Sequence, residues 1–253
     1  MVDTEIVDCI GGMTRVGDTI DSIKRELQAY ADPGKAMHSY KFFQAYPGGY
    51  GEGDKFLGLK VPEQRKVAKA FYKDVTTAEV EKLLQEDIHE YRLTALFILT
   101  YKYAKAERSQ ERQEIAELYL RNLAFVNNWD LVDASAEKIL GPYLADKDRS
   151  LLYKLADSGD LWKQRVAVIA TFYFIHGGQF EDTLQLAERL LSHKHDLIHK
   201  AVGWMLREVG KRDLAAEEDF LKKHYKNMPR TMLRYAIEKL EPERRKMYLQ
   251  GEI

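Results

Sequence analysis

The segment Asn127–Leu140, with the sequence NNWDLVDASAEKIL, has the pattern of a helix that begins at a capped N-terminus. Asn128 is a typical N-cap residue, and Asp130 suits the partial positive charge at the start of a helix. At about 100° per residue, one face carries an apolar stripe that consists of Trp129, Val132, Ala136 and Leu140. Asp133 falls inside this stripe, where a carboxylate is costly unless a partner satisfies it. The segment therefore predicts a helix with an acidic side chain that needs an explanation.

Helix starts of this kind recur along the chain at a near-constant interval. They lie near residues 90, 128, 160, 196 and 229, which are 38, 32, 36 and 33 residues apart, and each interval contains a second helical pattern. Further helices are expected at 19–30, 34–46, 161–175 and 230–240, and no run alternates convincingly with the period of a strand. Recurring helix pairs of this length are typical of HEAT and armadillo proteins. The sequence therefore predicts an all-α fold, an α-solenoid of HEAT-like antiparallel helix pairs that forms a curved slab with a concave face.

Length and composition limit the class of protein. We expect residues 1–253 to form one HEAT-like repeat domain, with residues 1–14 as a candidate disordered extension. Cys9 is the only cysteine, which excludes an intramolecular disulfide and a cysteine-based zinc site. Charges interrupt every apolar run before it reaches membrane-spanning length, and the N-terminus lacks the features of a secretory signal. These features predict a cytoplasmic protein without a membrane-bound segment, and we expect a monomer.

The charge distribution gives only a weak indication of a partner. The formal net charge is −1, but 17 Lys and Arg face 14 Asp and Glu from Asp160 to the end of the chain. Taken alone, a mild excess of this size indicates an ordinary mixed surface rather than a surface for nucleic acid.

Three successive repeats each carry a candidate site residue near the start or middle of their first helix. These are Trp129 with Asp133, then Arg165 on an apolar stripe, then Trp204 beside Gly203. Each feature also has a structural interpretation: a satisfied buried aspartate, an ion pair, and a tryptophan at the edge of the core. Gly203 permits close approach by a neighbouring helix or by a ligand. Because equivalent helices of a solenoid line the same face, we expect the four side chains to converge in the concavity.

Two other motifs do not predict a cofactor. His193, His195 and His199 have the spacing of metal ligands, but no carboxylate triad or cysteine completes a site, and Asp196 is interpreted as an N-cap. The glycine-rich segment 47–54, PGGYGEGD, lacks the Gly-Lys-Ser/Thr ending of a phosphate-binding loop. We therefore expect neither a metal nor a small-molecule cofactor.

The sequence resembles the AlkD-like family of HEAT-repeat alkylpurine DNA glycosylases over about residues 20–250. The resemblance rests on WDLVD (129–133), LWKQR (161–165) and HKAVGWMLRE (199–208), and on MHSYKFF followed by GEGDKFLGLKVPEQRK (51–66). It implies that Asp133 is the catalytic carboxylate and that Trp129 and Trp204, with Tyr40, form an aromatic cleft around the lesion. It further implies that Arg165 contacts the DNA backbone.

The resemblance implies a hydrolase that removes cationic N3- or N7-alkylated purines from double-stranded DNA without a flipped-base pocket. A carboxylate suits this chemistry, because cleavage of the bond to C1′ gives the sugar oxocarbenium character that a negative charge stabilises. Two alternatives stay open. The first is a non-catalytic HEAT-like module that binds DNA or a protein partner through the same concave face, and the second is an interaction scaffold with no role on nucleic acid. The near-zero net charge favours the scaffold, whereas basic residues confined to the concave surface would favour DNA binding.

Overall fold

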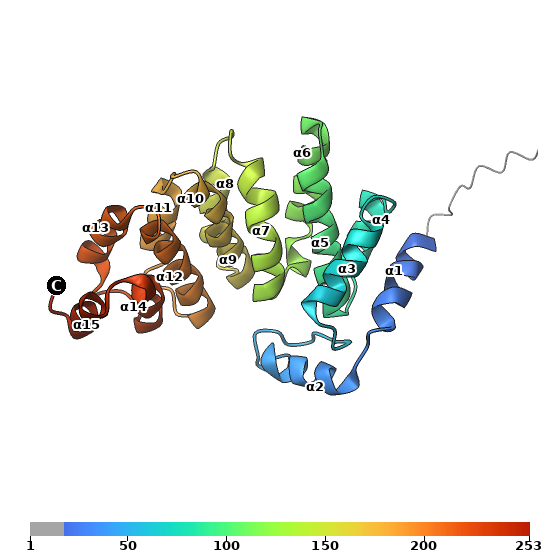
Figure 1. Cartoon of the computed structure of the whole chain (residues 1–253), viewed down its shortest axis with the longest axis horizontal. Coiled ribbons are helices and arrows are strands. Elements are labelled where there is room, and N and C mark those ends of the chain that lie inside the picture. Colours follow the sequence, from blue (N-terminus) through green and yellow to red (C-terminus); the bar gives the residue numbers. More distant parts are fainter. Residues whose placement is uncertain (1–17) are drawn as a thin grey trace, which may run out of the picture.

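The computed structural model describes residues 18–253, which form a curved row of helices (Figure 1). The first half of the row contains α1 (Asp18–Gln28), α2 (Pro33–Phe42), α3 (Val61–Phe71), α4 (Thr77–Leu84), α5 (His89–Lys105), α6 (Ser109–Arg121), η1 (Leu123–Phe125) and α7 (Trp129–Tyr143). The second half contains α8 (Ser150–Ala156), α9 (Leu161–Ala170), α10 (Phe172–His176), α11 (Glu181–Arg189), α12 (Asp196–Gly210), α13 (Leu214–His224), α14 (Arg230–Ala236), η2 (Ile237–Lys239) and α15 (Pro242–Gln250).

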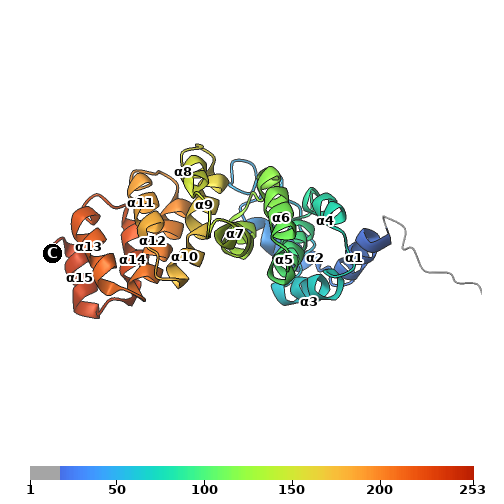
Figure 2. The same ribbon diagram turned by 90° about the horizontal axis from the view of Figure 1, so that it is seen from above.

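The helices are stacked as successive pairs. The first helices of the pairs pack against one another in the order α3, α5, α7, α9, α12 and α14, while α4, α6, α8, α11 and α13 cover them on one side (Figure 2). α2 departs from this pattern, since it lies crosswise to the neighbouring helices, below the ends of α1 and α3 in Figure 1, and has no buried residue. The arrangement confirms the predicted all-α solenoid of HEAT-like helix pairs.

One continuous hydrophobic core runs along the row from α1 to α15. α5 lies at its centre, with Leu96, Ile98 and Leu99 fully buried, and each such side chain contributes roughly 1.5–3 kcal/mol to folding. Close contacts between adjacent first helices require glycine, because a Cβ atom on Gly203 would lie 2.4 Å from the carbonyl oxygen of Met232 in α14. Of the two interpretations of Gly203, the structure therefore supports approach by a neighbouring helix.

Several helix boundaries differ from the predicted ones. The helix expected at 161–175 is broken at Thr171, whose hydroxyl donates to the carbonyl oxygen of Val168 at 2.7 Å and whose N–H donates to the same oxygen at 3.2 Å. Such local bonds tighten the turn and compete with the regular helix ladder. The helix expected at 34–46 ends at Phe42, two residues before Gln44, which has a positive φ of 50°. The candidate disordered extension, residues 1–14, lies outside the described residues.

Candidate active site

The first turn of α7 presents Trp129 and Asp133 at the edge of the core. Asn128 accepts a hydrogen bond from the Trp129 N–H at 2.9 Å, which confirms it as the N-cap. Val132, Ala136 and Leu140 are fully buried, whereas Trp129 and Asp133 are only partly buried. The apolar stripe therefore faces the core, and the carboxylate lies where that stripe meets a cleft.

Asp133 is held by a bidentate ion pair with Arg165 of α9. The guanidinium donates from Nε to Oδ1 at 2.9 Å and from Nη2 to Oδ2 at 2.7 Å, and its Nη1 donates to the carbonyl oxygen of Leu197 at 2.6 Å. The Asp133 side chain is 19% exposed, but that of Arg165 is only 5% exposed. Arg165 is therefore almost wholly buried between α9 and its partners, and its guanidinium is engaged by Asp133.

Two opposing effects act on the Asp133 carboxylate. Burial raises its pKa above the ordinary value, while the charge and hydrogen bonds of Arg165 lower it. The nearby charge of Asp130 adds to the upward shift. Burial prevails, so the pKa of Asp133 lies above its ordinary value, and Arg165 limits this rise while it fixes the position of the carboxylate.

Asp133 and Arg165 lie in a cleft of about 460 Å³ that is formed by five segments of the chain. The residues that line it are Phe42, Gln44, Tyr50, Trp129, Asp133, Arg165, Leu197, Lys200, Trp204, Arg207 and Tyr235. The four candidates from successive repeats, Trp129, Asp133, Arg165 and Trp204, are therefore brought together. Their convergence follows from the stacking of α7, α9 and α12.

The two tryptophans belong to separate aromatic groups. The Trp129 ring lies 5.9 Å from that of Phe42 and 5.4 Å from that of Phe43. The Trp204 ring meets Phe172 edge to face at 5.7 Å, and its indole N–H donates to Glu208 at 3.2 Å. Both rings are part-buried, so their neighbours limit the orientations that they can adopt.

Tyr40 does not line this cleft. It lies in a neighbouring hollow with Met37 of α2 and Leu57 of the segment before α3. Phe42 and Tyr50 take the place in the cleft that was expected for Tyr40. Tyr50 belongs to the glycine-rich segment 47–54, and the sequence carried no local signal that this tyrosine would reach the cleft.

Cationic side chains on α12 were also missed by the sequence analysis. Lys200 and Arg207 line the cleft together with Arg165. Lys200 pairs with Asp196 at 2.7 Å, and Arg207 forms an ion pair with Glu238. Their spacing on one helical face was visible in the sequence, but their position relative to Asp133 depends on how α12 packs against α9.

Three histidines lie at the start of α12, with His193 and His195 before the helix and His199 in its first turn. Nδ1 of His193 accepts from the His195 N–H at 3.0 Å, and Nδ1 of His195 accepts from the Leu197 N–H at 3.1 Å. His195 is therefore the N-cap, in place of the expected Asp196, which is the first residue of the helix. Within residues 18–253, no group of three or more His, Cys, Asp and Glu side chains has an arrangement that could hold a metal ion. No helix in this range is both long and apolar enough to cross a membrane.

Fold and cleft together define an α-solenoid that presents a carboxylate between aromatic side chains. Residues 23–240 match the family model described as DNA alkylation repair enzyme, and the chain belongs to this family. A solved structure described as a predicted DNA alkylation repair enzyme from Enterococcus faecalis has the same fold, with a TM-score of 0.63 and 17% sequence identity. The similarity covers 84% of this chain and 97% of that one. No curated protein matches the sequence.

Proposed function

We propose that the protein is a DNA glycosylase that hydrolyses the N-glycosidic bond of cationic N3- and N7-alkylated purines in duplex DNA. Membership of the DNA alkylation repair enzyme family supports a role on alkylated DNA. The observation that carries the proposal is the carboxylate of Asp133, which is fixed by two hydrogen bonds from Arg165 in a cleft that also contains Trp129 and Trp204.

The reaction needs little help at the base itself. Alkylation at N3 or N7 leaves a positive charge on the purine, so the bond from C1′ breaks with its electron pair moving onto the ring nitrogen. The base leaves neutral, and the positive charge moves to the sugar as an oxocarbenium-like centre. A water molecule then adds to C1′ and loses a proton to solvent. The ionised carboxylate of Asp133 stabilises the sugar cation, and it can orient this water.

The aromatic rings of the cleft favour a cationic nucleotide. An exposed cation over a tryptophan face gains about 0.5–1 kcal/mol, and a desolvated cation gains more. Trp129 and Trp204 lie on different helices, so a nucleotide in the cleft has an aromatic side chain from each of two repeats. Capture of the lesion between these rings would not require a deep pocket for a flipped base.

Contacts to the DNA backbone are assigned to the cations around the carboxylate. Lys200 is partly exposed, and its compact charge suits a phosphate oxygen. Arg165 uses three N–H groups within the protein, which leaves one N–H on each terminal nitrogen for a phosphate at the cleft. Tyr40 on α2 would contact DNA beside the cleft and not within it.

Incubation with methylated duplex DNA tests the proposal directly. The wild-type protein should release N3-methyladenine and N7-methylguanine, which chromatography of the supernatant detects. Undamaged duplex of the same sequence is the control, and it should lose no base. Binding to duplex DNA without any release of base would contradict the proposal and favour the non-catalytic DNA-binding module. An absence of both binding and release would favour the protein-interaction scaffold.

A further inference from the structure

The glycine-rich segment 47–54 forms part of the cleft wall although it lies far from α7, α9 and α12 in the sequence. The Tyr50 hydroxyl donates to the carbonyl oxygen of Phe42 at 3.2 Å. The Tyr50 ring meets Trp162 edge to face at 6.0 Å and lies 6.5 Å from His195. Tyr50 thereby places the segment beside the N-terminal ends of α9 and α12, in the cleft that also contains Asp133.

Close packing holds this segment against the rest of the protein. A Cβ atom on Gly51 would lie 2.4 Å from the carbonyl oxygen of Phe43 and 3.1 Å from Nδ2 of Asn128. A Cβ atom on Gly49 would lie 1.9 Å from the carbonyl oxygen of Gln44. Glycine is therefore required at both positions for the backbone to approach so closely.

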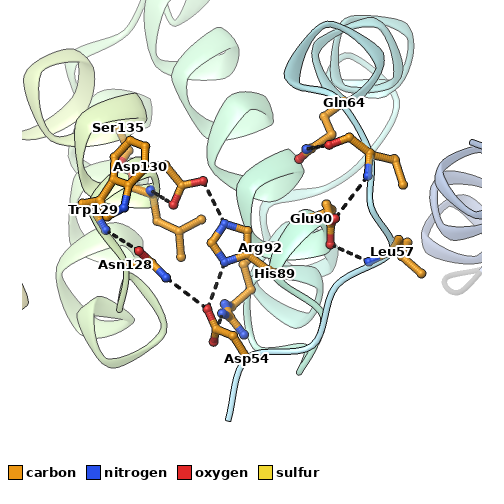
Figure 3. Close-up of polar contacts among 12 residues, drawn as sticks. Asp54, Leu57, Gln64, His89, Glu90, Arg92, Asn128, Trp129, Asp130 and Ser135 are labelled. Carbon is orange, nitrogen blue, oxygen red and sulfur yellow. Dashed lines mark hydrogen bonds and ion pairs between the residues drawn. The ribbon is translucent and has the colours of Figure 1, made fainter. Parts of the chain in front are cut away.

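Asp54, the last residue of the segment, enters a buried polar cluster (Figure 3). Its carboxylate contacts Nδ1 of His89 at 3.0 Å and Nη2 of Arg92 at 2.6 Å, both on α5. Nε2 of His89 contacts Asp130 of α7 at 2.8 Å. His89 thus bridges the glycine-rich segment and the first turn of α7, the turn that carries Trp129.

The charge state of His89 allows both contacts at once. Burial alone would lower the pKa of His89, but Asp130 and Asp54 outweigh it and raise the pKa to about 9. At neutral pH the ring is an imidazolium that donates from both nitrogens, whereas a neutral ring has a single N–H. Arg92 is the other cation of the cluster and shares Asp54, and the rings of Phe43 and Phe56 lie 4.9 and 5.0 Å from the His89 ring.

We propose that His89 is a positioning residue that couples the glycine-rich segment to α7, so that Tyr50 and Trp129 form one continuous wall of the cleft. The role of this wall in nucleotide binding rests on the proposed function, whereas the coupling by His89 does not. His89 itself is 2% exposed and does not touch the cleft, so it acts through Asp54 and Asp130.

His89→Gln tests the coupling, because a neutral amide nitrogen cannot bridge two carboxylates that lie on opposite sides of a ring. His89→Gln/Asp130→Asn removes one charge of each sign and keeps the cluster neutral. His176→Gln is the matched control, since His176 is half-exposed and lies 3.7 Å from a single carboxylate, that of Glu137.

Amide hydrogen exchange of the free protein is the first measurement. In both His89 variants, the amides of residues 47–54 should exchange about tenfold faster or more, while those of α12 keep the wild-type rate. The His176→Gln protein should show wild-type exchange in both regions. Wild-type exchange of residues 47–54 in both His89 variants would overturn the proposal. Loss of folding in both variants would also overturn it, because His89 would then be a structural residue.

A double-mutant cycle with Tyr50→Ala links the coupling to the site. Each single variant, His89→Gln and Tyr50→Ala, should lower kcat/KM for base release by about tenfold. Because both changes act on one wall, the double variant should be as active as the less active of the two single variants. Independent, multiplicative losses would overturn the link. If the wild-type protein released no base, the proposed function would fail, but the exchange measurement would still decide whether His89 couples the two segments.

Discussion

Asp133→Asn is expected to weaken both catalysis and the fold, because one carboxylate serves the cleft and the buried guanidinium. Asparagine keeps one acceptor oxygen for Arg165 but turns an N–H₂ group toward the second guanidinium nitrogen. The loss of a hydrogen bond to a charged group costs about 1.5–3 kcal/mol, and the 19% exposure of Asp133 favours the lower end. For a chain of 253 residues, a loss of about 2 kcal/mol lowers the melting temperature by roughly 4–8 °C.

The effect on catalysis should be much larger than this loss of stability. Removal of one electrostatic stabiliser of a transition state typically reduces the rate by about 10²–10³-fold. Single-turnover release of base from methylated duplex, measured well below the melting temperature, should show a decrease of this size. An Asp133→Asn protein that excises at the wild-type rate would refute the catalytic role.

A second variant separates catalysis from stability. Asp133→Asn/Arg165→Met removes both charges, and replacement of a buried pair by apolar groups is often neutral or stabilising. The double variant should therefore recover most of the lost melting temperature while its base release stays low. Recovery of base release together with stability would show that Asp133 only balances Arg165, and this would refute the reasoning.

Asp157→Asn is the matched control for the same chemical change in an exposed pair. Asp157 contacts Arg189 at 2.6 Å, and the two side chains are 53% and 46% exposed. Exposed pairs contribute at most about 1 kcal/mol. The control should therefore melt close to the wild-type temperature and release base at the wild-type rate.

Three further predictions follow from the charges and the packing. Affinity for duplex DNA should fall steeply between low and physiological salt. Lys200→Ala should reduce the slope of log K against log salt concentration by about one. An affinity that does not change with salt would count against phosphate contacts. The pKa of His89 is raised from 6.5 to about 9. The protonated ring therefore contributes its full stabilisation of the fold below pH 6.5, and this contribution is lost as the pH rises through 9. Melting temperature should therefore fall from pH 7 to pH 10 in the wild type and fall less in His89→Gln. Gly203→Ala should destabilise the fold by about 1–3 kcal/mol in denaturant titrations, because its Cβ would lie 2.4 Å from the Met232 carbonyl oxygen; unchanged stability would show that α14 can move away.

The fold was predictable because its determinants are local. Helix starts expected near 90, 128, 160, 196 and 229 correspond to helices that begin at His89, Trp129, Leu161, Asp196 and Arg230. N-caps and amphipathic periodicity set each start, and both act within one or two turns of the chain. The break at Thr171 was not predictable, since the residues around it continue the helical pattern and the interruption comes from bonds to Val168.

The N-terminal part of the site depends on contacts that the sequence pattern does not contain. Tyr40 lies on α2, which has no buried residue, so periodicity does not determine which of its faces meets the cleft. Tyr50 lines the cleft from a segment whose last residue, Asp54, is bound by His89 and Arg92 on α5. Contacts of this kind link residues more than 30 positions apart, and only the tertiary structure brings them together.

The sequence suggested two explanations for Asp133, a structural ion pair or a catalytic carboxylate. The geometry is compatible with both roles at once, because the carboxylate that pairs with Arg165 also lines the cleft. Catalytic stabilisation of a cation requires a carboxylate that is already ionised and fixed before the reaction begins. Arg165 favours both conditions, because its charge and hydrogen bonds limit the rise that burial causes in the Asp133 pKa, and the same two hydrogen bonds fix both oxygens. Arg165 is nearly completely buried whereas the carboxylate is partly exposed, so the carboxylate is the more accessible member of the pair for the sugar of a nucleotide. The ion pair with Arg165 would thus allow Asp133, on an otherwise apolar helix face, to be ionised in the cleft.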